Sequence, residues 1–257
     1  MKNILLAGLA WAALAGPVAA GEKVIIEADD DYAPYSYVDK GLHKGIYVDF
    51  IKKAAEKLAP TYDVVLQPVP WKRGLSNLEN GESLGLFPPY QNKDRKYIQT
   101  YSTPLYRETI VLFCTDDVMK KSRKNFPDDF SGLVVGVNLG FVLGEKMAAA
   151  TKAGKIKAEE VKGNDANIKK LNAGRIDCYA NDRLSVIHSA KGLRNEAAFK
   201  SFKLNEAAEL SGEDAFIAYS AANKATYKAD FIGKMNAAIE EANKAGVLTK
   251  LIADYAR

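Results

Sequence analysis

Few side chains in this sequence are of the types that catalysis or metal binding requires. His43 and His188 are the only histidines among the 257 residues, and neither stands in a metal-type cluster with cysteines or acidic residues. The chain contains no Cys-x-x-Cys, no His-Glu-x-x-His, no phosphate-binding glycine loop with lysine and no nucleophile elbow. His43 lies in a hairpin rich in glycine and lysine, where a solvated turn is expected. The sequence therefore predicts no metal site, no cofactor and no catalytic residue.

Charge and length exclude further classes of protein. The net charge of +4 is small for 257 residues, and the lysines are scattered without the aromatic and basic interleaving of a nucleic-acid groove. We therefore expect no nucleic-acid partner. The length allows one large or two medium domains, and either size buries enough apolar surface to fold.

Residues 1–20 are predicted to form a signal peptide. Lys2 gives a positive start, an apolar stretch follows, and Val18-Ala19-Ala20 is a small-residue cleavage site. No later segment approaches the ~18 apolar residues of a membrane span. Neither Cys114 nor Cys178 is near the cleavage site, so we expect no N-terminal lipid anchor. The mature chain, from Gly21, is expected to be free in the periplasm.

The elements that must position any binding residues alternate between strand and helix. In the first half, strands are expected at 22–28 and 62–69, and helices at 48–60 and 71–80. The second half is expected to contain strands at 133–140, 176–180 and 216–220, a helix at 144–154, and a helix that Asn164 or Asp165 caps and Gly174 ends. It is expected to close with an amphipathic helix pair at 230–256. Such alternation is typical of an α/β fold with a mainly parallel sheet.

A repeated pattern indicates two similarly built halves. Residues 78–90 read LENGESLGLFPPY and residues 171–182 read LNAGRIDCYAND. Leu78 and Leu171, like Gly81 and Gly174, are 93 residues apart. Each stretch ends a helix at a glycine and continues into a short strand.

The order of these segments resembles the solute-binding proteins of polar amino acid ABC transporters, extracellular solute-binding protein family 3. DDYAPYSYVDKGLHKGIYVDF is similar to the family's Tyr-x-Pro-Phe followed by Gly-Phe-x-x-Asp. NKDRKYIQTYSTPLY is similar to Thr-x-x-Arg before Phe-Ser-x-Pro-Tyr, and GRIDCYAND to Gly-x-x-Asp-Ala ending in Asp. The closing helix pair KMNAAIEEANKAGVLTKLIADY is also similar.

The resemblance implies the type II periplasmic binding protein fold, with two α/β lobes that close over a ligand. Lobe 1 is expected to comprise residues 21–108 and 209–257, and lobe 2 residues 109–208. Hinge strands are expected near Tyr106–Thr109 and Leu204–Asp214. Ligand would lie between the lobes, at the carboxyl ends of the strands.

By this resemblance, Arg95 holds a ligand carboxylate and Asp182, on the other lobe, holds an ammonium group. A guanidinium offers a planar fork of donors to a carboxylate, and a carboxylate accepts from ammonium. The alternative is that both residues form ordinary surface ion pairs, which contribute ~0–1 kcal/mol.

Other expected ligand contacts follow from the same comparison. Asp29 and Tyr32 match family positions after the first strand, and Trp71 matches an aromatic that stacks on the ligand, although a core role is its alternative. Arg73 is either a second anion contact or a solvated helix residue.

The sequence departs from the family at other cleft positions, where hydroxyl donors are replaced by apolar residues. These positions are Phe87, Pro88, Pro89 and Tyr90 before the arginine, and Phe141 and Val142 after Gly140; in addition, Asn92 replaces the usual threonine. Of these, we count Pro88, Tyr90, Gly140, Phe141 and Val142 as expected ligand contacts. Either the ligand is larger and more apolar, or the grip on an α-amino acid has been rebuilt.

The family topology also places the strand TIVLFC antiparallel beside IDCYA. Cys114 and Cys178 then face each other, and an oxidising periplasm permits a disulfide. Buried free cysteines are the alternative.

The function that follows is capture of an amino acid or related carboxylated solute, without catalysis, by a monomer that delivers it to an ABC transporter permease. An alternative is a cyclohexadienyl-dehydratase-like enzyme, for which Glu145 is the candidate acid. A soluble ligand-sensing module is a third reading.

Overall fold

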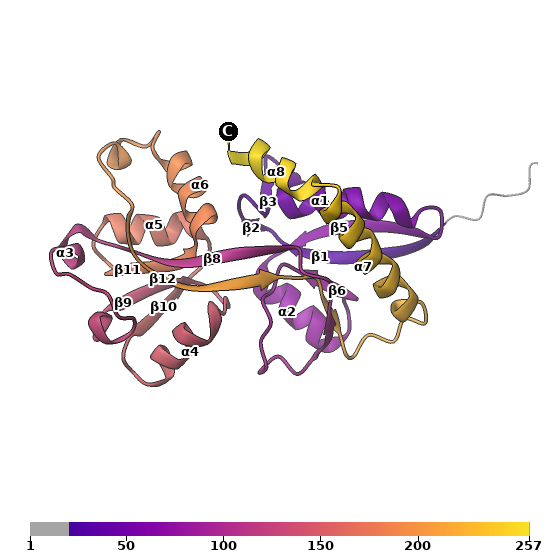
Figure 1. Cartoon of the computed structure of the whole chain (residues 1–257), viewed down its shortest axis with the longest axis horizontal. Coiled ribbons are helices and arrows are strands. Elements are labelled where there is room, and N and C mark those ends of the chain that lie inside the picture. The colour runs from indigo at the N-terminus through magenta and orange to yellow at the C-terminus, as the bar shows by residue number, and fades with distance from the viewer. Residues whose placement is uncertain (1–20, 257) are drawn as a thin grey trace, which may run out of the picture.

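The computed structural model describes residues 21–256, which form two five-stranded sheets with helices on their faces. Figure 1 shows the two sheets and their helices as two bodies along the long axis of the molecule. We call these bodies the first and the second lobe. The two-lobed α/β class predicted from the sequence is thus confirmed. The predicted signal peptide, residues 1–20, lies outside the described residues.

The first lobe is built on the sheet β5-β1-β6-β13-β7. β5 and β6 are parallel to β1, whereas β13 is antiparallel to both of its neighbours. Four strands therefore run in one direction and β13 runs against them. The strands are β1 (Glu22–Asp29), β5 (Tyr62–Val69), β6 (Gly85–Phe87), β7 (Ile98–Tyr101) and β13 (Ala218–Ser220).

Helices cover both faces of this sheet because its strands are apolar on both sides. Val24 and Ile26 of β1 belong to the core cluster that includes the inner faces of α1 and α7. Leu86 and Ala218 pack with Leu78 of α2 on the opposite face. The helices are α1 (Ile46–Ala55), α2 (Trp71–Asn80), α7 (Lys228–Lys244) and α8 (Val247–Ala256). A small meander, β2 (Asp31–Tyr32), β3 (Ser36–Asp39) and β4 (Leu42–Lys44), precedes α1.

The second lobe repeats this plan on the sheet β10-β9-β11-β8-β12. β10 and β11 are parallel to β9, and β8 is antiparallel to both β11 and β12. The strands are β8 (Tyr106–Cys114), β9 (Val134–Asn138), β10 (Lys157–Val161), β11 (Cys178–Asp182) and β12 (Asn205–Ala215).

Helices cover both faces of the second sheet as well. Val111 and Tyr179 pack with Ile168 of α5 and Val186 of α6, while Met147 of α4 packs in the cluster of the other face. The helices are α3 (Asp116–Met119), α4 (Gly144–Lys152), α5 (Asn164–Asn172) and α6 (Arg183–Leu193). No helix of the described residues is long and apolar enough to cross a membrane.

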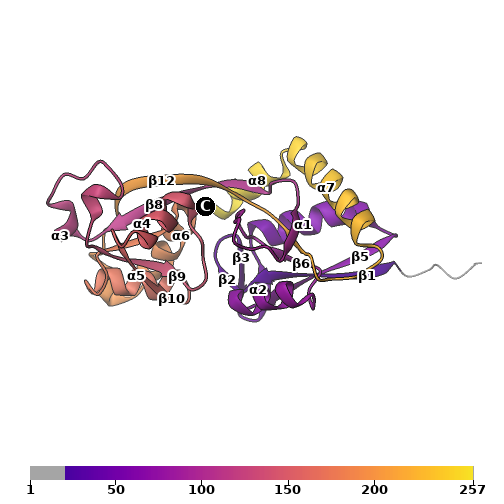
Figure 2. The same ribbon diagram turned by 90° about the horizontal axis from the view of Figure 1, so that it is seen from below.

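β8 and β12 connect the lobes. They pair antiparallel from Tyr106 and Ala215 at one end to Cys114 and Asn205 at the other. In Figures 1 and 2 both strands run side by side from the second lobe toward the first. The predicted lobe boundaries, 108/109 and 208/209, fall inside these two strands.

The repeated glycine pattern marks equivalent turns in the two lobes. Gly81 follows α2 with φ of 79° and Gly174 follows α5 with φ of 63°. This left-handed conformation ends a helix and suits glycine. The chain then enters β6 in one lobe and β11 in the other.

A disulfide joins Cys114 and Cys178. The two cysteines are directly opposite each other in the β8–β11 register, at the end of β8 and the start of β11. The bond closes a loop with a sequence separation of 64. It lies at the opposite end of β11 from Asp182.

Candidate functional site

The carboxyl ends of parallel strands from both lobes meet in one place. Asp29 ends β1, Trp71 begins α2 directly after β5, and Pro88 follows β6. From the second lobe, Gly140 and Phe141 follow β9. Open α/β sheets bind ligands at this edge, because the loops that follow the strands can diverge there.

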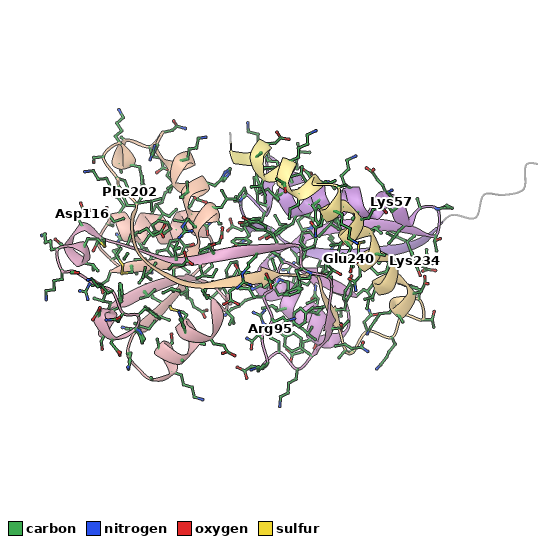
Figure 3. The ribbon with its side chains drawn as sticks, viewed as in Figure 1. Lys57, Arg95, Asp116, Phe202, Lys234 and Glu240 are labelled. Carbon is green, nitrogen blue, oxygen red and sulfur yellow. A yellow bond between two sulfur atoms is a disulfide. The ribbon has the colours of Figure 1, made fainter. Side chains whose placement is uncertain are left out.

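A cavity of about 280 Å³ lies between these strand ends. Eight of the eleven predicted ligand contacts line it, and Pro89 completes the wall. The lining residues are Asp29, Tyr32, Trp71, Pro88, Pro89, Tyr90, Arg95, Phe141 and Val142. In Figure 3, Arg95 lies toward the middle of the molecule, away from Asp116 and Phe202 at the far end of the second lobe.

Arg95 supplies a positive charge to the cavity. Its guanidinium donates a hydrogen bond to the Gly140 carbonyl at 3.2 Å and lies over the Trp71 ring at 5.8 Å. The arginine ion pairs among the described residues involve Arg107 and Arg183, not Arg95. Burial lowers the pKa of Arg95. A half-buried guanidinium with unused donors and no carboxylate partner favours an anionic ligand.

An aromatic wall crosses the boundary between the lobes. Phe141 of the second lobe packs edge-on against Tyr32 at 5.2 Å and Trp71 at 5.7 Å, both in the first lobe. The Trp71 indole N–H donates to the Gly140 carbonyl at 3.2 Å. Gly140 has φ of 78°, and a side chain there would crowd Lys72 and Trp71. Gly140, one of the predicted ligand contacts, therefore contributes to the cavity through its backbone.

Asp29 is a carboxyl on the cavity wall. It is 2% exposed, and burial raises its pKa to about 8. The backbone N–H of Asp31 donates to Oδ1 at 2.9 Å, and this bond opposes the rise. Within hydrogen-bond reach of a ligand, such a group accepts when ionised and donates when protonated.

A second cavity, of about 380 Å³, shares Asp29, Trp71 and Phe141 with the first. Asp31 and Lys162 are among its other lining residues. The space between the lobes therefore continues past the aromatic wall to a region lined by charged side chains.

Asp182, which the sequence predicts to face the ligand opposite Arg95, does not line this cavity. Its carboxylate caps α6 by accepting the Ser185 N–H at 2.8 Å, and it also accepts the Thr109 N–H at 3.1 Å. The Tyr35 hydroxyl also donates to it, at 3.0 Å across the lobes. Burial raises the pKa of Asp182 to about 6. The carboxylate thus accepts hydrogen bonds from the start of α6, from β8 and from the other lobe.

Two other charged candidates are also placed elsewhere. Arg73 is exposed on α2, because the first turn of the helix buries Trp71 and Gly74 instead. Glu145 has a side chain that is 91% exposed and lies 3.4 Å from Lys93. Glu145 does not line the cavity, so it is not placed to act as an acid on a ligand bound there.

Sequence reasoning missed Glu108, which is fully buried under the tyrosines of the cavity wall. The hydroxyls of Tyr32, Tyr47 and Tyr90 all donate to its carboxylate. A signal was available, since alternate residues of β8 place Glu108 on the same side as buried Ile110. A charged residue on the apolar face of a strand indicates a buried group with polar partners, because glutamate is almost never fully buried without them.

Within the described residues, no group of three or more His, Cys, Asp or Glu side chains is placed to hold a metal ion. The site therefore consists of an arginine, several aromatic rings and buried carboxyls. Such a set can bind a small charged molecule by ion pairing, stacking and hydrogen bonds.

Comparison with solved structures finds the same fold in binding proteins. The arginine-, lysine- and histidine-binding protein ArtJ from Geobacillus stearothermophilus is 21% identical, with a TM-score of 0.70, over 91% of this chain and 95% of that one. AncCDT-1, an ancestral amino acid-binding protein and precursor of cyclohexadienyl dehydratase, is 20% identical, with a TM-score of 0.69, over 91% and 94%. A histidine kinase sensor domain similar to periplasmic binding proteins is 16% identical, with a TM-score of 0.72, over 91% and 96%.

A search of curated protein sequences finds no significant match. The model of one protein family, in contrast, matches residues 24–257, which is nearly the whole chain. Together with the two-lobed fold and the cavity between strand ends, this match shows that the chain belongs to the bacterial extracellular solute-binding proteins, family 3.

Proposed function

We propose that the protein binds an amino acid or a related small carboxylated solute between its lobes and delivers it to an ABC transporter permease. The observation that carries the proposal is Arg95, a half-buried guanidinium on the cavity wall with no carboxylate partner in the described part of the chain. A ligand carboxylate would supply the missing counter-charge through a bidentate ion pair.

The family and the fold support an amino acid as the solute. ArtJ binds arginine, lysine and histidine, and an ancestral arginine-binding protein with a TM-score of 0.72 has been solved with arginine bound. In this chain, aromatic rings and the carboxyl of Asp29 stand where the rest of such a ligand would lie. A cation or apolar group stacked on a ring gains ~0.5–2 kcal/mol.

Closure of the lobes over the ligand fits the contacts around the cavity. Arg95 and Trp71 of the first lobe both donate to Gly140 of the second. We place the lobes at residues 21–108 with 209–257 and at residues 109–208, with β8 and β12 as hinges. Ligand bound to both lobes stabilises the closed form that a permease recognises.

The proposed setting is the periplasm, after removal of residues 1–20, with the protein acting as a monomer. The extracellular family supports this location. We expect binding without turnover, because the candidate acid Glu145 is solvated. Incubation with prephenate, followed by absorbance of aromatic product, should show no conversion above a protein-free control.

A thermal-shift screen of the twenty amino acids and small organic acids tests the proposal. A ligand at 100 times its dissociation constant adds ~2.7 kcal/mol of stability. Arg95→Ala is expected to weaken any carboxylated hit about a hundredfold, the effect of losing two hydrogen bonds between charged groups. Arg73→Ala, which removes an exposed arginine from α2, is the matched control and should keep the shift. Equal shifts in wild type and Arg95→Ala would reject the anion site.

A further inference from the structure

Glu108 is a buried acid on one of the two connecting strands. Its side chain is 0% exposed, and no ion pair within residues 21–256 includes it. The neighbouring Arg107 is exposed, so the alternation of β8 turns Glu108 inward. A carboxylate in such a place requires hydrogen-bond donors in place of water.

Three tyrosine hydroxyls from three parts of the first lobe provide these donors. Tyr47 of α1 donates to Oε1 at 2.6 Å. Tyr90, in the loop after β6, donates to Oε2 at 2.5 Å, and Tyr32 of β2 donates to the same oxygen. Tyr32 and Tyr90 line the cavity, whereas Tyr47 does not.

This arrangement determines what the two cavity tyrosines can offer a ligand. A phenol hydroxyl has one proton and retains acceptor lone pairs. When Tyr32 and Tyr90 both donate to Glu108, their oxygens, which are 3.2 Å apart, have only acceptor capacity left. The tyrosine wall then accepts N–H groups and repels carboxylate oxygens, while Arg95 provides donors elsewhere on the same cavity.

We propose that Glu108 is a positioning residue that fixes the Tyr32 and Tyr90 hydroxyls as acceptors, so that the cavity selects a carboxylate bearing a protonated amine over the same acid without the amine. This inference rests on the proposed function. It assigns recognition of the amine to the tyrosine wall instead of Asp182, whose carboxylate is occupied by Ser185, Thr109 and Tyr35.

The selection should depend on pH. Burial and the nearby Asp182 carboxyl raise the pKa of Glu108 to about 8, and the hydroxyls of Tyr32, Tyr47 and Tyr90 oppose the rise. Protonated Glu108 has an O–H of its own, which occupies a tyrosine oxygen and lets one tyrosine proton turn away. Preference for the amine therefore increases as pH rises through about 8. Asp29, on the cavity wall, also has a pKa of about 8. Its ionisation therefore adds to the pH dependence of the preference for the amine independently of Glu108.

Calorimetric titration with matched ligand pairs tests the inference. The pairs are L-arginine with 5-guanidinopentanoate and L-phenylalanine with 3-phenylpropanoate, which differ within each pair only in the α-amine. Wild type should bind the amino acid of a pair more tightly. Glu108→Gln keeps the shape but supplies N–H donors to the phenol oxygens, and should reduce the preference for the amine about tenfold or more, the effect of one hydrogen bond to a charged group. The affinity of the deaminated acid for the variant should be within about threefold of its affinity for wild type, because its own contacts are unchanged.

Two further variants keep the test decisive if Glu108→Gln folds poorly. Tyr90→Phe removes one acceptor and keeps the ring, so it should also reduce the preference for the amine. Tyr62→Phe removes a hydroxyl that donates to Asp230 at 2.6 Å, outside the cavity lining, and should leave the preference unchanged.

Each outcome bears on one of the two proposals. Equal losses for amine and deaminated ligands in Glu108→Gln and Tyr90→Phe would show a merely structural role and overturn the inference. Wild type that binds the deaminated acid as tightly as the amino acid would overturn the inference and leave the carboxylate site standing. Wild type that binds no member of either pair and no acid of the thermal screen would overturn the proposed function.

Discussion

At the scale of single residues, the site is unusual for its buried acids. Asp29 and Glu108 are almost fully buried, and neither has a lysine or arginine within ion-pair distance among the described residues. Desolvation is the largest cause of the raised pKa of each, which is about 8 in both cases. Below that pH the folded protein holds protons that the unfolded chain has already released.

This proton balance predicts how the stability of the ligand-free protein changes with pH. Between the unfolded pKa of about 4.5 and the folded value of about 8, the folded state binds more protons, so the free energy of unfolding decreases as pH rises. Glu108→Gln removes one of these groups. The thermal midpoint of wild type minus that of Glu108→Gln should therefore decrease from pH 5.5 to pH 8.5. A difference that is constant with pH, or that shifts in favour of wild type, would contradict the assignment.

Much of the cavity lining could be predicted residue by residue, because Asp29, Trp71 and Arg95 lie in stretches that resemble the family's sequence. For Asp182 the sequence predicts a ligand contact but does not show its structural partners. It ends β11, and the start of α6 directly behind it makes the carboxylate a helix cap. Glu108 was missed because its partners, Tyr32 and Tyr90, are 76 and 18 residues away in sequence.

At the scale of elements, strand direction and pairing divide the second lobe into two ends. The cavity lies beyond the carboxyl end of β9, whereas the Cys114–Cys178 disulfide lies at the start of β11. Stability contributed by the bond should therefore be separable from binding.

Replacing both cysteines by serine should lower the free energy of unfolding by about 2–4 kcal/mol, as expected for a loop of this length. Urea unfolding measures this change. Ligand affinity should stay within about twofold, because the cavity lining contains neither cysteine. A loss of affinity comparable to that of Arg95→Ala would mean that the bond also shapes the cavity.

Most helices and strands could be predicted from periodicity, but α6 could not. Its buried face carries Ser185 and Ser189 beside Val186 and Ala190, so the sequence does not show a continuous apolar stripe. The serine hydroxyls instead bond to the buried amide of Asn164. Polar pairs of this kind depend on tertiary contacts that are invisible in local sequence.

At the scale of the whole molecule, contacts between the lobes surround the cavity. The Tyr35 hydroxyl donates to Asp182, and the Ser185 hydroxyl donates to the Ala33 carbonyl at 2.6 Å. On the exposed rim, Lys162 pairs with Asp30 at 3.0 Å. The buried contacts should contribute more to closure than the exposed pair, which solvent screens.

Tyr35→Phe tests this view, since Tyr35 does not line the cavity. Loss of its hydrogen bond to Asp182 should favour the open form and weaken ligand binding about three- to tenfold. Small-angle X-ray scattering should show a larger radius of gyration for the ligand-free variant than for ligand-free wild type. Lys93→Ala, which removes the exposed pair with Glu145 between the lobes, is the control and should change neither quantity measurably. An unchanged radius and affinity in Tyr35→Phe would show that the contact does not control closure.

The most direct test of the central claim is a crystal structure with the tightest-binding carboxylated solute of the thermal screen. We predict that the solute lies between the lobes with its carboxylate hydrogen-bonded to the Arg95 guanidinium. A solute bound outside this cavity, or held in it with its carboxylate directed away from Arg95, would contradict the account.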